Sequence, residues 1–445
     1  MATGLALGLA SGARAQDVPP LLVFDLGSRL SLDDNPDLIL GGSDSQARLD
    51  TNLGLTLNSV TRDQNFLLSL SGLMRLDDEG LAFRDPSVRL RYGREAANSR
   101  LSVGGVLSQS PVDLFEPLIG LDGGVITTDI LATTGEVTSR TADLSFATGL
   151  QAPLGFDLAA SVSERDYSDT TDPAVFDNSS RNLSLGMQLR QPSAGREISL
   201  TLRGSATDFD NLTHTTREGR SLSFGYAQDL QPELRLRASL GQTRSDSRQD
   251  GAADISSEGA TGSLGLEAGL ANGSASVTLA SERDVLGSRG TLQFSRSLDL
   301  PDGTLEATLG LSSRPGEAGQ LVANLRYAQD LGGGSISVGL SRQIALNAAN
   351  QDVANTVLDV NYEHDINDRS RLGLSLNLLG TGSGGIAGVT EAQRQSFSAS
   401  YSRDLIADWQ VTAGYQFRSL DTSTTDAAQS NTVFLTVSRR FTLRP

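Results

Sequence analysis

The stretch Trp409–Ser419 reads WQVTAGYQFRS, and its odd-numbered positions from Trp409 to Phe417 are all apolar or aromatic. The even-numbered positions between them are glutamine, threonine, glycine and arginine. Because successive side chains of a strand point to opposite faces, this stretch predicts a strand with one apolar and one polar face. Such a strand needs either a second protein layer or lipid to cover its apolar face.

The same alternation recurs along the chain, with small polar and charged residues between the apolar positions. No helical pattern or second set of strands is left over to cover the apolar faces, and a disordered chain has no reason to keep a period of two. We therefore predict an all-β fold, a single transmembrane antiparallel β-barrel. Representative apolar series are Leu49, Leu53, Leu55 and Leu57; Leu234, Leu236, Ala238 and Leu240; and Leu305, Ala307, Leu309 and Leu311.

Composition excludes several other classes of protein. Only 38% of the residues are apolar, and no apolar run approaches the roughly 18 residues of a transmembrane helix. Cysteine is absent, which rules out disulfides and thiolate metal sites. A net charge of −17 argues against nucleic acid as a partner.

The N-terminal residues have the features of a secretory signal. Leu5–Ala10 form a short apolar core, and Ala13-Arg14-Ala15 fits a small-residue cleavage site. We predict a signal peptide over residues 1–15 and a barrel over residues 16–445. The usual positively charged leader is missing, so we expect the true start to lie upstream of Met1.

Strands end in two ways that alternate along the chain. One end is a tight turn preceded by an aromatic residue, as in Tyr226-Ala-Gln-Asp-Leu230 and Tyr327-Ala-Gln-Asp-Leu331. These aromatics fit a girdle at the membrane surface, although an aromatic covering the edge of a soluble core is the alternative. The predicted girdle residues are Tyr92, Tyr226, Phe294, Tyr327, Tyr362 and Tyr401.

The other ends are longer and more acidic, for example Ser245 to Glu258 and Asp421 to Ser430. Short turns on one side and long loops on the other are typical of outer-membrane barrels, so we place the turns in the periplasm and the loops outside. The count of arms predicts about 22 strands, within a range of about 18 to 24, and periplasmic termini.

One connection, Ser108 to Arg140, lacks the strand pattern over much of its length and is more apolar than the other loops. A long loop without secondary structure is often functional. Residues 109–139 either fold into the lumen and narrow it, or form an extracellular flap or an extra hairpin, and the sequence does not choose between them.

The chain offers little for catalysis. Its only histidines are His214, in an acidic loop, and His364, in a short turn, so they are expected on opposite rims. No serine elbow accompanies either, and we predict no enzyme activity, no metal site and no cofactor. The turn from Asp33 to Asp37 carries oxygen ligands suited to Ca²⁺ but lacks EF-hand spacing, so a solvated turn is the default.

If the barrel is right, the polar faces point into the lumen. Opposed charges across a pore favour polar solutes, whereas charges that only pair with one another hydrate the inner wall. The sequence leaves both readings, and the charge selectivity, open. The predicted pore-lining residues are Arg29, Arg89, Arg91, Arg203, Arg235, Arg237, Arg326, Arg418, Glu267, Glu306 and Asp359.

The final arm, Asn431 to Phe441, resembles the C-terminal signature of Gram-negative outer-membrane barrels, in which an aromatic ends the last strand. Val433, Leu435, Val437 and Phe441 fit this signature, whereas Arg439 stands where an apolar residue is usual. Over roughly residues 20–441 the chain also looks like the β-barrel porin families of proteobacteria. The resemblance implies location in the outer membrane, contact with its lipid and lipopolysaccharide, and recognition of the signature by the barrel-assembly machinery.

These observations predict an outer-membrane channel for passive passage or export of polar solutes, with saccharides among the candidates. Two alternatives stay open: a barrel with a structural or surface-interaction role, and a secreted soluble β-repeat adhesin. A TonB-dependent receptor shares the strand number, but such a receptor needs a plug of more than about a hundred residues before its strands.

Overall fold

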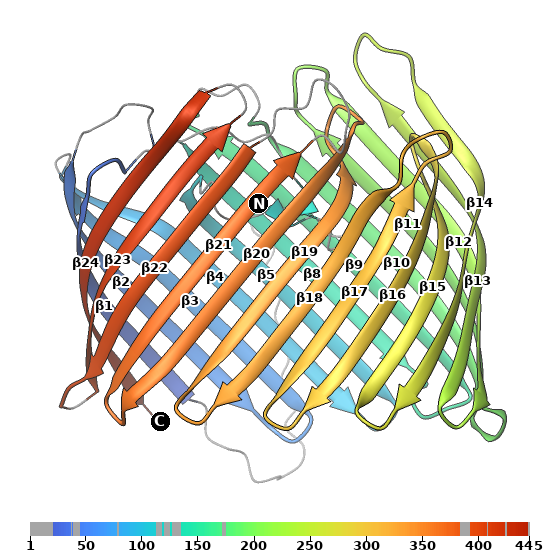
Figure 1. Cartoon of the computed structure of the whole chain (residues 1–445), viewed down its shortest axis with the longest axis horizontal. Helices are drawn as coiled ribbons and strands as arrows, with labels where there is room; N and C mark the ends of the chain where they lie inside the picture. The colour runs from blue at the N-terminus through green and yellow to red at the C-terminus, as the bar shows by residue number, and fades with distance from the viewer. Residues whose placement is uncertain are drawn as a thin grey trace, which may run out of the picture.

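The computed structural model shows an antiparallel barrel of 22 strands, in which β1 pairs with both β2 and β24 and so closes the sheet (Figure 1). The predicted fold class and strand number are therefore confirmed. The structure describes residues 21–36, 38, 45–77, 80–112, 118–119, 125–126, 135–170, 175–382, 392–406, 408–422 and 425–443. The predicted signal peptide, residues 1–15, lies outside these residues.

The wall strands follow one another in chain order around the barrel. They are β1 (Leu21–Asp33), β2 (Gln46–Val60), β3 (Gln64–Asp77), β4 (Gly80–Ala96), β5 (Ser99–Pro111), β8 (Glu136–Thr148), β9 (Leu154–Ser168), β10 (Asn178–Gln191), β11 (Arg196–Phe209), β12 (Thr215–Gln231), β13 (Leu234–Arg248), β14 (Ile255–Leu270), β15 (Gly273–Asp284), β16 (Gly287–Leu300), β17 (Gly303–Ser313), β18 (Gln320–Leu331), β19 (Gly334–Leu346), β20 (Asp352–Asn367), β21 (Ser370–Gly382), β22 (Ala392–Asp404), β23 (Trp409–Thr422) and β24 (Thr425–Leu443).

Two shorter features complete the description. A separate pair of very short strands, β6 (Leu118–Ile119) and β7 (Val125–Ile126), lies within the connection from β5 to β8. A single 3-10 turn, η1 (Pro192–Ala194), connects β10 to β11. No helix among the described residues is long and apolar enough to span a membrane.

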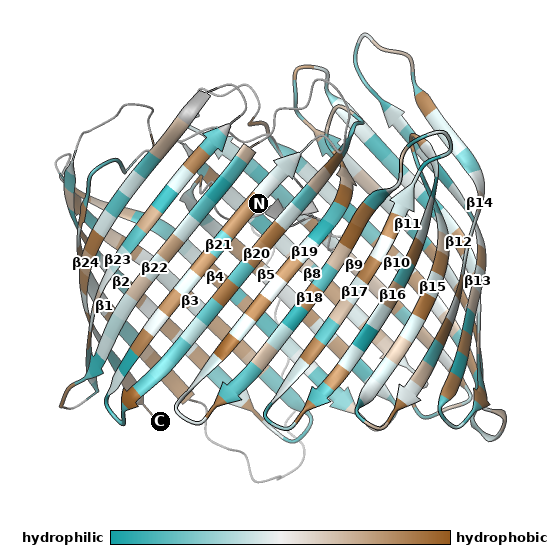
Figure 2. Ribbon diagram, in the orientation of Figure 1, coloured by the Kyte–Doolittle hydropathy of each residue, from teal (hydrophilic) through white to brown (hydrophobic). Residues whose placement is uncertain are grey.

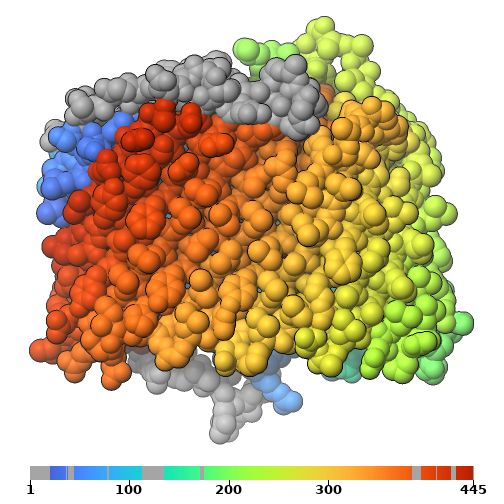
Figure 3. Space-filling model, in the orientation of Figure 1, coloured from blue at the N-terminus to red at the C-terminus, as the bar shows by residue number. Residues whose placement is uncertain are grey.

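The apolar side chains of the wall lie outside, where lipid would cover them. Hydropathy alternates residue by residue along each strand (Figure 2), and the leucines of one parity are exposed, for example Leu202 at 50% and Leu240 at 68%. Figure 3 shows one face of the barrel as a continuous wall of side chains. Since burial in lipid replaces burial in a protein core, the soluble adhesin does not fit this fold.

The strands run further outward than the sequence predicted. Ser245 to Glu258 and Asp421 to Ser430 were expected to be loops, yet β13 and β14 leave only residues 249–254 between them, and β23 and β24 leave only 423–424. Both faces of a strand can be polar once it rises above the membrane, so the polar composition hid these strand ends. The short turns lie at the opposite rim, to which the C-terminal strand also runs (Figure 1).

Candidate functional site: the lumen and its outer mouth

The predicted pore-lining residues all occupy strand positions opposite to the exposed apolar residues, which is the luminal side of a closed barrel. Many of them pair there: Arg235 with Glu197 at 3.3 Å, and Arg237 with Glu267 at 3.1 Å. Glu306 and Arg326 face each other across β17 and β18, and Asp359 accepts a hydrogen bond from Asn377. Arg89 and Arg91 in β4, and Arg203 in β11, share the same side. Ion pairs and hydrogen bonds within the wall therefore involve part of this set of residues. The role of the whole set as a pore lining stays a prediction.

A second group of luminal arginines surrounds a cavity of about 350 Å³ in the wall formed by β1 to β4, β22 and β23. Here Arg418 donates to Asp33 at 3.0 Å. Asp50 forms ion pairs with Arg48, at 3.3 Å, and with Arg75, at 2.9 Å. Closure of the barrel between β1 and β24 is what brings Arg418 next to residues from the start of the chain. We refer to this space as the Arg29 cavity. It is lined by Arg29, Arg48, Asp50, Asn52, Leu73, Arg75, Asp85, Ser396, Gln416 and Arg418.

The outer mouth above the lumen contains the buried hydrophobic cluster found in the described part of the chain. Leu38, Val175, Leu420 and Ala428 form it, with the side chains of Val112 and Tyr167 packed against them. These residues come from the β1–β2 and β9–β10 loops, from the residue that follows β5, and from β9, β23 and β24, so the cluster joins widely separated parts of the rim. We call it the mouth cluster.

On the other side of the mouth, the connection between β19 and β20 reaches across the rim. We call this segment, residues 347–351, the strap. Arg217 of β12 donates to Asn350 Oδ1 at 2.9 Å and to the carbonyl of Asn347, and Asn350 donates to Ser247 of β13 at 3.2 Å. The strap therefore passes the outer ends of β14 to β18, which separate these two pairs of strands in the sheet.

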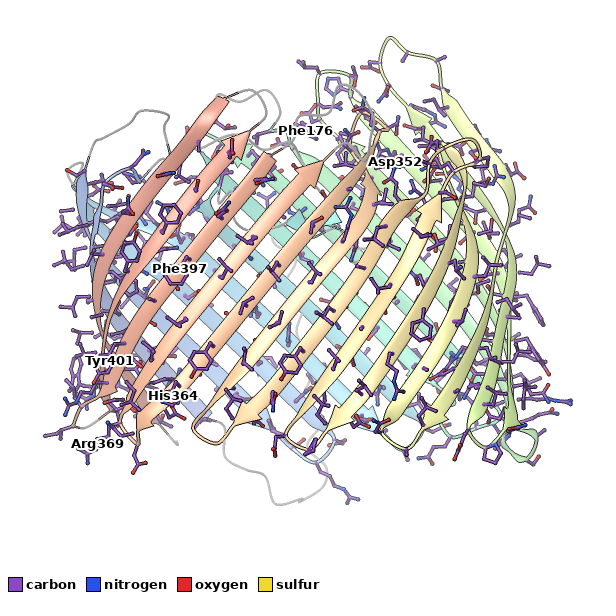
Figure 4. The ribbon with its side chains drawn as sticks, viewed as in Figure 1. Phe176, Asp352, His364, Arg369, Phe397 and Tyr401 are labelled. Carbon is purple, nitrogen blue, oxygen red and sulfur yellow. The ribbon has the colours of Figure 1, made fainter. Side chains whose placement is uncertain are left out.

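The mouth cluster and the strap are linked by aromatic contacts. Phe176, which follows Val175 of the mouth cluster, packs edge-on against Phe209 with ring centroids 6.0 Å apart. The guanidinium of Arg217 in turn lies 5.2 Å from the centroid of Phe209. One connected layer of side chains thus extends along the outer mouth from β24 to β20, and Figure 4 shows Phe176 and Asp352 at this rim.

The base of the strap is fixed by a buried network of charges. Arg314 donates through Nε to Asp352 at 2.8 Å and through Nη1 to Asp284 at 2.9 Å, and Arg289 also donates to Asp352. Asp352 is only 1% exposed and Arg314 6%. Burial alone lowers the pKa of Arg314, but its hydrogen bonds to Asp352 and Asp284 outweigh burial, so the pKa is raised above its usual value. Sequence analysis missed this network, because its members lie at strand ends and in loops without periodicity.

The predicted girdle residues lie near the short-turn ends of their strands. Tyr401 donates to Ser370 Oγ at 3.1 Å, and Tyr362 stacks on His364 with ring centroids 6.3 Å apart. Figure 4 shows Tyr401 and His364 at this rim, with Arg369 in the adjoining turn. Tyr92, Tyr226, Phe294 and Tyr327 occupy equivalent positions in β4, β12, β16 and β18. Their function as a membrane anchor stays a prediction.

The predicted assembly signal lies in β24, with Val433, Leu435 and Val437 all exposed on the outer face. Phe441 packs against Phe24 of β1 with ring centroids 5.9 Å apart, across the seam that closes the barrel. Arg439, which departs from the signature, places its guanidinium 4.4 Å from the Phe441 centroid and 5.4 Å from that of Trp409. Recognition by an assembly machinery stays a prediction.

The remaining predictions concern the two histidines, metal binding and the long connection. His214 lies 2.7 Å from Asp210 in the β11–β12 loop, and His364 is at the other rim. Among the described residues, no group of three or more histidine, aspartate or glutamate side chains could hold a metal ion. Most of the long connection, residues 113–117, 120–124 and 127–134, lies outside the described residues, so its predicted position is a proposal below.

A closed 22-stranded barrel with an apolar outer face and a charged lumen defines an outer-membrane β-barrel of the Gram-negative type. No family model and no curated protein matches this chain. Its likeness is to solved structures. The FrpB iron transporter from Neisseria meningitidis matches with a TM-score of 0.59 and 11% identity, over 94% of this chain and 82% of that one.

Two further structures show the same likeness. The ferric citrate transporter FecA, in its unliganded form, matches with a TM-score of 0.59 and 10% identity, over 94% of this chain and 78% of that one. BauA, the ferric preacinetobactin receptor from Acinetobacter baumannii, matches with a TM-score of 0.56 and 11% identity, over 96% of this chain and 80% of that one. At such low identity the likeness establishes the fold and carries no ligand over to this chain.

Proposed function

We propose that this chain is an outer-membrane transport barrel for polar solutes whose outer mouth is narrowed by its own loops. The observation that carries the proposal is the combination of a wide lumen lined by charged side chains with a connected layer of contacts across the mouth. A 22-stranded barrel is too wide for its own side chains to fill, so an inner obstruction determines what passes.

The connection between β5 and β8 is the second part of the proposal. Its short strand β7 contacts β19, which lies about half-way round the barrel from β5 and β8. This contact supports a course of residues 109–139 through the lumen, where they would narrow the passage. An extra wall hairpin beside β5 and β8 would not reach β19, and the conductance measurement below separates a course through the lumen from an extracellular flap.

Single-channel conductance of the refolded protein in a planar bilayer tests both parts. The matched variant has residues 113–134 replaced by a short glycine-serine linker, which leaves β5 and β8 intact. We expect a small conductance from the intact chain and a several-fold larger one from the variant, because the narrowest part of a pore dominates its resistance. Absence of current from both, with both proteins migrating as folded heat-modifiable barrels, would favour the structural barrel instead.

A second transport mode is suggested by the fold likeness to iron transporters and receptors. In that mode the barrel binds a large ligand from outside and stays closed until it is opened. Calorimetric titration of the folded protein with ferric citrate distinguishes the two. Saturable binding together with a closed wild-type pore would favour the receptor mode, whereas an open pore without binding would favour passive passage or export of polar solutes such as saccharides.

A further inference from the structure

Arg29 differs from the paired arginines of the lumen, such as Arg235 and Arg237, because its charge is not neutralised by a direct partner. Its guanidinium stacks on the ring of Phe434 at 3.9 Å, and within the described chain its side chain forms no ion pair or hydrogen bond. Asp50 faces it across the β1–β2 pair, but Asp50 is held by Arg48 and Arg75. The N–H groups around the edge of Arg29 are therefore available to an acceptor.

The surroundings of Arg29 add to its positive charge. Arg48, Arg75 and Arg418 line the same cavity, against two lining carboxylates, Asp50 and Asp85, and against Asp33, which pairs with Arg418 from outside the lining. With Arg29 there are four arginines for three carboxylates. The Nε atom of Arg418 is buried and has no hydrogen-bond partner in the described chain. Buried donors without partners are costly, so an acceptor entering the cavity is favoured both by charge and by hydrogen bonding.

Neutral polar groups complete the Arg29 cavity. Asn52, Ser396 and Gln416 line it and offer amide and hydroxyl groups, which pair well with hydroxyls. Asp85 also faces it, from a bulge between β3 and β4 where its φ is 53°, a conformation that only a few non-glycine residues adopt. Residues held in such a strained backbone conformation cluster at functional sites, and this one places a carboxylate beside a basic cavity.

We infer that the Arg29 cavity binds a small organic oxyanion, a carboxylate or phosphate that also carries hydroxyl groups. The anionic oxygens would lie against the N–H edge of Arg29 and be attracted by Arg418, while hydroxyls would pair with Asn52, Gln416 and Asp85. A volume of about 350 Å³ accommodates a solute of about sugar size. The inference rests on the proposed transport function, because the ligand reaches this wall through the lumen.

The test is calorimetric titration of the full-length protein, folded in detergent, with four probes. Gluconate and glycerol 3-phosphate carry both an anion and hydroxyls, inorganic phosphate carries only the anion, and glycerol carries only hydroxyls. We expect gluconate, glycerol 3-phosphate or both to bind at least about tenfold more tightly than inorganic phosphate or glycerol. The better of the two identifies the anionic group as a carboxylate or a phosphate.

Variants then locate the site. Arg29→Gln removes the unpaired cation and is expected to weaken binding at least about tenfold. Arg29→Lys keeps the charge but not the planar guanidinium, so its affinity should lie between those of the unchanged protein and Arg29→Gln. The control is Arg237→Gln, which removes a luminal arginine that is already paired with Glu267 in the opposite part of the barrel. This control should change affinity less than about twofold.

Two results would overturn the inference: no probe binds better than glycerol, or Arg29→Gln and Arg237→Gln weaken binding equally, which means a general effect of luminal charge. If inorganic phosphate bound as tightly as gluconate and glycerol 3-phosphate, the part of the inference that requires hydroxyl groups on the ligand would be wrong. If Arg29→Gln does not fold, the probe series on the unchanged protein and Arg29→Lys still decide. Because the titration needs no current, binding without conductance would contradict only the transport function, and conductance without binding only this site.

Discussion

Two arginine clusters of the barrel use the same side chain in opposite ways. At the strap, Arg314 is 6% exposed and its donors are divided between Asp352 and Asp284. In the Arg29 cavity, Arg29 rests on an aromatic ring and has no carboxylate of its own. The first arrangement satisfies the charge with protein groups and the second leaves it open to solvent and solute.

The difference separates structural charges from charges that can bind a ligand. A buried pair contributes little net stability when intact but becomes very costly when one partner is removed. An exposed or half-buried cation over a ring contributes on the order of 0.5–1 kcal/mol. The two clusters should therefore respond in opposite ways to substitution, the strap in stability and the Arg29 cavity in affinity.

The largest effect is expected at the strap. Asp352→Asn removes the carboxylate of Arg289 and leaves the buried Arg314 with Asp284 alone, and should destabilise the barrel by about 3–5 kcal/mol. Arg29→Gln, the matched change in the other cluster, should cost less than about 1 kcal/mol. Reversible urea unfolding in lipid vesicles measures both, and similar losses in the two variants would mean that the clusters do not differ in kind.

A smaller effect is expected where the strap meets β12. Arg217→Gln removes the donors to Asn350 and Asn347 and should weaken the attachment of the strap by about 1–3 kcal/mol, without touching the Arg314 network. We expect the strap to open more often and the single-channel conductance to rise about twofold. The control is Arg220→Gln, whose side chain lies 3.2 Å from Glu218 and on the opposite face of the same strand from Arg217. An unchanged conductance in Arg217→Gln would show that the strap does not restrict the lumen.

The wall of the barrel was predictable because its physics is local. A period of two fixes which face of each strand meets lipid, and short turns with aromatics mark one rim, so strand number and fold class follow from residues such as those of Trp409–Phe417. The outer ends of β13, β14, β23 and β24 were not predictable in this way, since above the membrane neither face needs to be apolar.

The site was predictable only in part. Alternation alone named Arg29 and Arg418 as luminal, but their shared cavity depends on the pairing of β1 with β24, residues at opposite ends of the chain. Phe434, an aromatic at a luminal position of β24, was the available signal for something unusual there. Asp284, Arg314 and Asp352 meet through loops and strand ends, and no periodicity in the sequence connects them.

The smallest effect is expected at Arg439, which tests whether stacking alone explains the behaviour of Arg29. Both arginines lie over phenylalanine rings, but Arg439 is on the outer face beside Trp409 and Phe441. Arg439→Leu exchanges a cation–ring contact for a side chain that suits lipid, so stability should change by less than about 1 kcal/mol. Gluconate affinity should not change, because no solute in the lumen reaches this face. A loss of affinity like that of Arg29→Gln would mean that binding depends on the overall charge of the barrel. A large loss of stability would mean that the arginine–ring contact, and not the lack of a carboxylate partner for Arg29, distinguishes the Arg29 cavity from the Arg314 network.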